Sequence, residues 1–174
     1  MSTSAPAPLL EAAPARGHRA KAATIGWREM VGLPDLGIGK LKAKIDTGAR
    51  TSALHAVELA PFARDGAEWI AFTVPVTGSR RRLRSEAPII DQRPIRNTSG
   101  VAEPRFVIET TLVLGRRHWL IEVSLANREE MEFDLILGRT AIRRHRLLVH
   151  PGRSFLAGDP MRLRRTGAPS SDRR

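Results

Sequence analysis

The sequence of 174 residues contains no cysteine. This absence excludes disulfides, thiol nucleophiles and zinc sites with cysteine ligands, and it agrees with a reducing compartment, so we expect a cytoplasmic location. No apolar run approaches the roughly 20 residues of a membrane-spanning helix, and no membrane partner is expected. The Ala/Pro-rich residues 1–23 lack the continuous apolar stretch of a signal peptide.

Several catalytic signatures are missing as well. The sequence has no G-x-S-x-G elbow for a serine nucleophile and no H-E-x-x-H zinc motif, and its five histidines are scattered without metal-ligand spacing. The glycines of residues 32–40 match neither a P-loop nor a dinucleotide-binding fingerprint. We therefore predict neither a cofactor nor a metal site.

The charge is strongly one-sided, with 29 basic and 18 acidic side chains and a net charge of +11. Residues 1–23 and 159–174 are rich in Pro, Ala, Ser, Gly and Arg and are predicted to be disordered tails. Residues 24–158 are predicted to form one domain, which is itself basic. That balance favours polyanionic partners such as acidic peptides or nucleic acid, although Arg-rich surfaces also occur without such partners.

The domain is predicted to be mostly β. Residues 40–45 alternate lysines with apolar residues, as a strand with one solvated face does. Gly115-Arg116 reads as a tight hairpin turn, and further strands are predicted at 68–76, 105–114, 117–125 and 133–138, the last buried on both faces. Residues 139–148 are the best helix candidate, and a final strand follows. This pattern is typical of a sandwich or a closed barrel.

Residues 91–105 are predicted to form a long loop, because they contain two prolines and a polar tip at Asn97, Thr98, Ser99 and Gly100 that suits a hairpin turn. Loops of this length inside compact domains are usually functional lids or disordered segments.

The strand at 40–45 runs directly into Asp46-Thr47-Gly48. Glycine allows a sharp turn, and an aspartate at this position is commonly a turn residue. The alternative is a catalytic acid. The three residues alone leave both interpretations open.

A longer set of motifs resembles a known family. Asp46-Thr47-Gly48-Ala49 and the later Leu137-Gly138-Arg139 are similar to the layout of retroviral-type aspartic proteases. A closer resemblance is to the retropepsin-like aspartic endopeptidases of bacteria and archaea, often labelled ATP-dependent zinc proteases and associated with RimK-type ATP-grasp ligases. The motifs that carry it are residues 26–29, 42–55, 105–110, 137–139 and 151–156.

This resemblance implies a closed acid-protease barrel of six or more strands with one short C-terminal helix. It implies a homodimer, because each chain supplies one Asp46 to a carboxylate pair that shares a proton and activates water. Thr47 and Gly48 would hold the carboxylates coplanar, and the tip from Asn97 to Gly100 would close over a peptide substrate beside Ala49. A functional link to an ATP-grasp peptide ligase is also implied.

The chain departs from the retroviral pattern after Ala49. Arg50-Thr51-Ser52 stands where those enzymes have acidic residues, so Arg139 lacks its expected carboxylate partner. Four arginines are candidates for binding an acidic, glutamate-rich peptide, because guanidinium groups match carboxylates; they are Arg50, Arg93, Arg96 and Arg105. The alternative for these four is a solvated basic face.

Three functions follow as hypotheses. The first is a homodimeric aspartic peptidase. The second is a zinc-dependent peptidase, as the older family label says. The third is a non-catalytic β module whose basic face binds an anionic partner such as RNA or a ribosomal protein.

Overall fold

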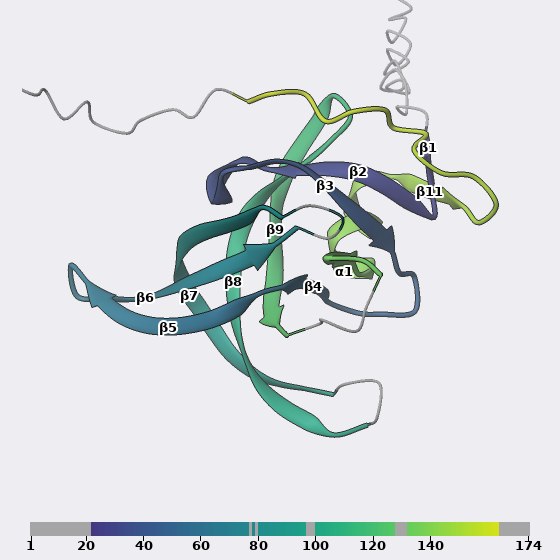
Figure 1. Cartoon of the computed structure of the whole chain (residues 1–174). Helices are drawn as coiled ribbons and strands as arrows, with labels where there is room; N and C mark the ends of the chain where they lie inside the picture. Colours follow the sequence, from purple (N-terminus) through teal and green to yellow (C-terminus); the bar gives the residue numbers. More distant parts are fainter. Residues whose placement is uncertain (1–21, 77, 79, 97–99, 128–131, 164–174) are drawn as a thin grey trace, which may run out of the picture.

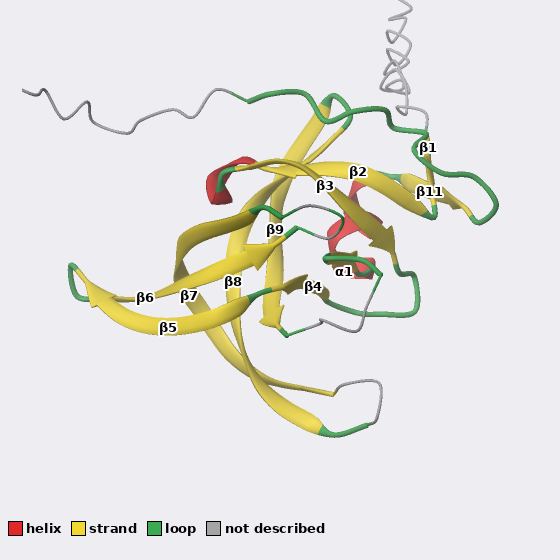
Figure 2. Cartoon of the chain, in the orientation of Figure 1, coloured by secondary structure: helices red, strands yellow, loops and turns green. Residues whose placement is uncertain are grey.

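The computed structural model describes residues 22–76, 78, 80–96, 100–127 and 132–163. Within these residues strands dominate, with one short α-helix and two 3₁₀ turns (Figures 1 and 2). The strands are β1 (Ala23–Gly26), β2 (Arg28–Leu33), β3 (Ile38–Ile45), β4 (Ser52–His55), β5 (Val57–Arg64), β6 (Ala67–Pro75), β7 (Arg82–Arg96), β8 (Ala102–Leu114), β9 (Arg117–Ala126), β10 (Leu135–Leu137) and β11 (Leu147–His150). The helical elements are η1 (Pro34–Leu36), α1 (Arg139–Ile142) and η2 (Arg143–His145).

Six strands form a closed hydrogen-bonded ring. Their order is β2-β3-β10-β4-β9-β8, and pairing of β2 with β8 closes it. The sheet continues beyond β8 through β7, β6 and β5; in Figure 1 β5 and β6 project to the left as a hairpin, and β7 runs with β8 to the bottom. β1 and β11 pair separately in parallel. The predicted mostly β class, with a closed ring and one short C-terminal helix, is confirmed.

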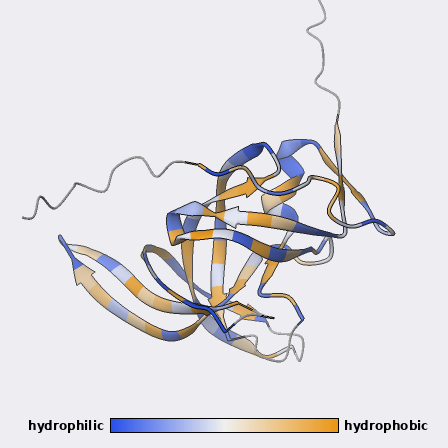
Figure 3. Ribbon diagram, turned by 45° about the horizontal axis from the view of Figure 1, so that its top comes forward, coloured by the Kyte–Doolittle hydropathy of each residue, from blue (hydrophilic) through white to orange (hydrophobic). Residues whose placement is uncertain are grey.

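Side-chain periodicity explains the strands that flank the Asp-Thr-Gly turn. On β3, Leu41, Ala43 and Ile45 are buried while the intervening lysines face outward, as the alternation predicts. All three residues of β10 are buried, because this strand is parallel to β3 on one side and antiparallel to β4 on the other. The same alternation of apolar and polar residues is visible along the strands in Figure 3.

Residues 91–105 do not form the long loop that the sequence predicts. Residues 91–96 are the end of β7 and residues 102–105 are the start of β8, and the two strands pair down to Arg96 and Ala102. Pro94 and Pro104 lie opposite each other, so the two missing N–H groups fall at one place in the ladder. Gly100 follows with a φ of 80°, and the predicted tip residues Asn97, Thr98 and Ser99 lie outside the described residues.

The helix predicted at 139–148 is shorter than expected. α1 ends at Ile142, η2 carries the chain to His145, and Arg146 adopts a left-handed conformation with a φ of 51°. The chain then continues as β11, which pairs with β1. A longer helix would also be destabilised by the repulsion between its closely spaced arginines. In the part of the chain that the structure describes, no helix is long and apolar enough to cross a membrane.

Candidate active site

Asp46 stands at the end of β3, where the parallel β3–β10 pair positions its backbone. Its N–H donates to the Leu137 carbonyl at 2.9 Å. Its Oδ1 accepts from the backbone N–H groups of Gly48 and Ala49, at 3.0 and 2.9 Å. Asp46 therefore stabilises the turn in the way that a turn aspartate does. The same two hydrogen bonds fix the position of one of its carboxylate oxygens.

The second oxygen of Asp46 has a different environment. Oδ2 lies 3.9 Å from the Lys44 ammonium, and the Asp46 side chain is 28% exposed. Thr47 and Gly48 beyond it are exposed. The loop thus offers a carboxylate that is oriented by the backbone and accessible from outside the chain.

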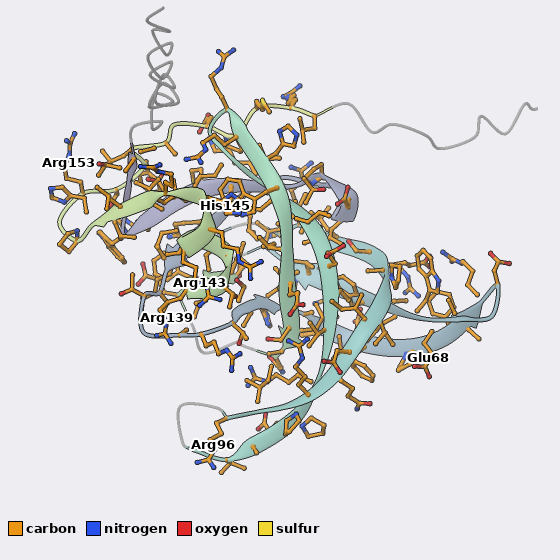
Figure 4. The ribbon with its side chains drawn as sticks, turned by 180° about the vertical axis from the view of Figure 1, so that it is seen from behind. Glu68, Arg96, Arg139, Arg143, His145 and Arg153 are labelled. Atoms are coloured by element: carbon orange, nitrogen blue, oxygen red, sulfur yellow. The ribbon has the colours of Figure 1, made fainter. Side chains whose placement is uncertain are left out.

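Arg139 binds the other side of this loop. Its Nη1 donates to the carbonyl oxygens of Thr47 and Gly48 at 3.0 and 2.8 Å. Its backbone N–H donates to the Ala49 carbonyl at 2.9 Å, and that of Thr140 to the Arg50 carbonyl at 3.1 Å. Backbone carbonyls therefore take the place of the carboxylate partner that the sequence lacks, and the guanidinium of Arg139 holds the loop. Arg139 is labelled in Figure 4.

Gly138 allows the two segments to approach closely. A Cβ at this position would lie 2.5 Å from the Thr51 carbonyl oxygen and 2.9 Å from the Arg50 carbonyl carbon. The Gly138 N–H donates to Ser52 Oγ at 3.2 Å, and Ser124 Oγ donates to the Ser52 carbonyl at 3.0 Å. The Leu-Gly-Arg motif was recognisable in the sequence, but the contribution of Ser52 and Ser124 was not.

The four candidate binding arginines fall into two groups. Arg50 is exposed on the Asp46 loop, and its side chain makes no hydrogen bond or ion pair in the described part of the chain. Arg93, Arg96 and Arg105 lie on the β7–β8 hairpin instead. In Figure 1 the β7–β8 hairpin runs toward the bottom, and the Asp46 loop follows the end of β3 at the right.

The hairpin arginines are not equivalent. Arg93 donates to Glu122 at 2.8 Å and to Asp91, and these hydrogen bonds, first that to Glu122 and then that to Asp91, raise the pKa of Arg93. The Arg93 guanidinium in turn lowers the pKa of Asp91, helped by the Gln92 N–H. Arg105 lies 3.6 Å from Glu103, and among the described residues its buried Nε has no hydrogen-bond partner. Arg96 is exposed near the hairpin end (Figure 4).

Metal ligands are not grouped in the described residues, where no three His, Asp or Glu side chains lie close enough to hold an ion. His55 and Asp134 are both buried and are joined through the backbone, the His55 N–H donating to the Asp134 carbonyl at 2.6 Å.

A closed ring of strands that presents an Asp-Thr-Gly loop, held by a Gly-Arg segment from a distant part of the chain, defines a retropepsin-like domain. The chain belongs to the RimB-like family, described as "Retropepsin-like aspartic endopeptidase RimB", whose model matches residues 24–160.

Its relatives include longer proteins. The chain is 46% identical over 137 residues to a protein of Parasynechococcus marenigrum named "Probable alpha-L-glutamate ligase", covering 78% of this chain and 29% of that protein. A protein of the same name from Desulfotalea psychrophila is 44% identical, with the same coverage. The chain therefore spans about three tenths of the length of these curated relatives.

The fold is shared with a solved structure. The crystal structure of a Legionella pneumophila protein of unknown function is 30% identical and superposes with a TM-score of 0.68. The match covers 78% of this chain and 98% of that one.

Proposed function

We propose that this chain is an aspartic peptidase whose active site is completed by a second copy of itself. The observation that carries the proposal is the Asp46 carboxylate. Its Oδ1 is fixed by two backbone N–H groups, and the side chain remains partly exposed at the end of β3. Each chain supplies one such carboxylate, and a two-fold axis beside the exposed Thr47 and Gly48 would bring two together.

The chemistry follows from the repulsion between two close carboxylates, which share one proton because they do not both ionise readily. The ionised Asp46 takes a proton from water, and the water oxygen bonds to the carbonyl carbon of the peptide. The protonated Asp46 of the partner gives its proton to the carbonyl oxygen. The tetrahedral intermediate then breaks its C–N bond: the amine leaves with the proton that Asp46 took from water, and the partner's Asp46 takes back a hydroxyl proton as the carboxylic acid product forms.

Acidic, glutamate-rich peptides are the proposed substrates. The longer relatives that contain a matching stretch are named "Probable alpha-L-glutamate ligase". In such a protein, as its name has it, this domain and a glutamate ligase would belong to one chain. This arrangement supports a functional link to an ATP-grasp ligase, with the peptidase removing what such a ligase adds. The exposed Arg50 beside Asp46 would receive a carboxylate of the substrate.

The test compares two isosteric changes of aspartate to asparagine. Asp46→Asn should abolish hydrolysis of an oligo-glutamate peptide, measured by mass spectrometry, and leave the circular dichroism spectrum unchanged. Asp65→Asn is the control, because Asp65 is exposed in the β5–β6 turn with a φ of 50° that asparagine tolerates. Normal cleavage by Asp46→Asn would end the proposal.

The same assay separates the other two hypotheses. Loss of cleavage on chelation, restored by zinc and unaffected by Asp46→Asn, would identify a zinc-dependent peptidase. Absence of any turnover together with salt-sensitive binding of RNA, retained in Asp46→Asn, would identify a non-catalytic module.

A further inference from the structure

Five arginines lie on two segments that contact each other, namely the start of β9 with the residue before it, and η2 with the residue after it. The α1–η2 basic surface consists of these five, Arg116, Arg117, Arg143, Arg144 and Arg146, all of them exposed. Figure 4 shows Arg139, Arg143 and His145 following one another along this part of the chain. The surface therefore begins next to the segment that holds the Asp46 loop and leads away from it.

Arg116 and Arg117 lie just before and at the start of β9, and Arg143, Arg144 and Arg146 lie on or just after η2. Contacts between β9 and η2 join these two groups of arginines. Arg117 Nη2 donates to the His145 carbonyl at 2.7 Å. The rings of Trp119 and His145 stack with centroids 4.2 Å apart, and Trp119 Nε1 donates to the Ala141 carbonyl at 2.9 Å. A 3₁₀ turn has about three residues per turn, so with His145 directed at Trp119 the side chains of Arg143 and Arg144 project elsewhere.

The charge of this surface is uncompensated within the described residues. Their ion pairs involve Lys40, Lys42, Lys44, Arg64, Arg82, Arg93 and Arg105, and none involves an arginine of the α1–η2 basic surface. The pKa of His145 is lowered by burial first and then by the charges of Arg117 and Arg144, which is consistent with a positive local potential. A surface of this kind attracts anions.

We propose that the α1–η2 basic surface binds an acidic polypeptide segment outside the Asp46 site. Guanidinium groups on adjacent side chains match successive carboxylates with paired hydrogen bonds. Single-stranded nucleic acid would in addition need an aromatic face on which bases stack. Trp119 does not offer one, because His145 covers its ring and the Arg117 guanidinium lies 5.8 Å from its centroid. The choice of a glutamate-rich peptide as probe rests on the proposed function, but binding does not require hydrolysis.

The test uses the full chain carrying Asp46→Asn, so that the probe is not consumed. Binding of a fluorescein-labelled oligo-glutamate peptide is measured by fluorescence anisotropy. Adding Arg143→Gln and Arg144→Gln should weaken binding about tenfold, the loss of roughly one charge-assisted contact. Adding Arg80→Gln and Arg84→Gln removes the same charge from exposed positions outside this surface and should change the Kd less than about twofold.

Each other outcome contradicts the proposal. Equal losses in the two double variants would mean attraction by net charge alone, and no binding at ionic strengths on the order of 0.1 M would mean no site. Tighter binding of an oligouridylate, with the same dependence on Arg143 and Arg144, would reassign the surface to RNA. Thermal unfolding of both variants checks that they are folded. Hydrolysis is measured separately, with Asp46 intact. The peptidase proposal can therefore fail while the binding proposal holds, and the binding proposal can fail while the peptidase proposal holds.

Discussion

Glu29 shows at the scale of one residue how this chain satisfies a buried charge. The side chain is 0% exposed on β2. Its Oε1 accepts from the backbone N–H groups of Gly26 at 2.6 Å and Leu156 at 2.9 Å, and the Ala157 N–H lies 3.2 Å from Oε2. The carboxylate thus joins the start of β2 to the segment after β11, and its burial is tolerated because backbone donors surround it.

Replacing this acceptor should be costly. In Glu29→Gln an amide NH₂ group takes the place of one oxygen and faces an N–H donor, so the free energy of unfolding should fall by about 2 kcal/mol. The control is Glu68→Gln, at an exposed position on β6 (Figure 4), which should stay within about 0.5 kcal/mol of the parent. Urea unfolding followed by tryptophan fluorescence measures both. Equal effects would show that the buried hydrogen bonds of Glu29 add no stability.

At the scale of elements, the junction between β10 and α1 supports the Asp46 loop. β10 lies between β3 and β4, so its end reaches the two strands that the loop connects. Gly138 lets the chain pass against Thr51, and Arg139 then binds the carbonyls of Thr47 and Gly48. The position of the carboxylate therefore depends on a segment about ninety residues away in sequence.

Adding one methyl group tests this junction. In Gly138→Ala the new Cβ would meet backbone atoms that cannot rotate away, so we expect a loss of about 3 kcal/mol in stability. Gly39→Ala on β3 is the matched control, since no atom lies within 4 Å of its added Cβ, and it should be neutral or stabilising by up to about 1 kcal/mol. Thermal unfolding compares the two. If both variants melt together, the close packing at Gly138 is not a constraint.

At the scale of the whole molecule, one chain carries one Asp-Thr-Gly loop, and the proposed peptidase needs two. The family match extends over residues 24–160. Beyond the predicted domain end at 158, Asp159 forms an ion pair with Lys40 at 2.7 Å, and the Met161 N–H donates to the Gly115 carbonyl at 2.8 Å. The disordered tails remain a prediction, since most of their residues, 1–21 and 164–174, lie outside the described part of the chain. The cytoplasmic location also remains a prediction.

The proposed dimer makes a prediction that a monomeric enzyme does not. When the parent chain is unfolded together with an equal amount of Asp46→Asn and refolded, random pairing should reduce the activity of the parent to about half, because mixed dimers have one ionisable carboxylate. An equal amount of Asp65→Asn should instead raise total activity. Peptide cleavage after refolding measures both mixtures. Unchanged activity with added Asp46→Asn would contradict a shared site.

The sequence by itself determined the features that depend on neighbouring residues. The alternating lysines predicted the solvated face of β3, and the apolar run predicted the buried strand β10. Asp46-Thr47-Gly48 predicted a turn that contains an aspartate. Only the tertiary structure decided the contacts between segments that are far apart in the sequence. Pairing with β8 turned the proline-containing residues 91–96 into strand, and parallel pairing of β3 with β10 brought Arg139 to the Asp46 loop. Such contacts depend on which strands become neighbours in the closed ring, and that choice is made by the folding of the whole chain rather than by any local pattern.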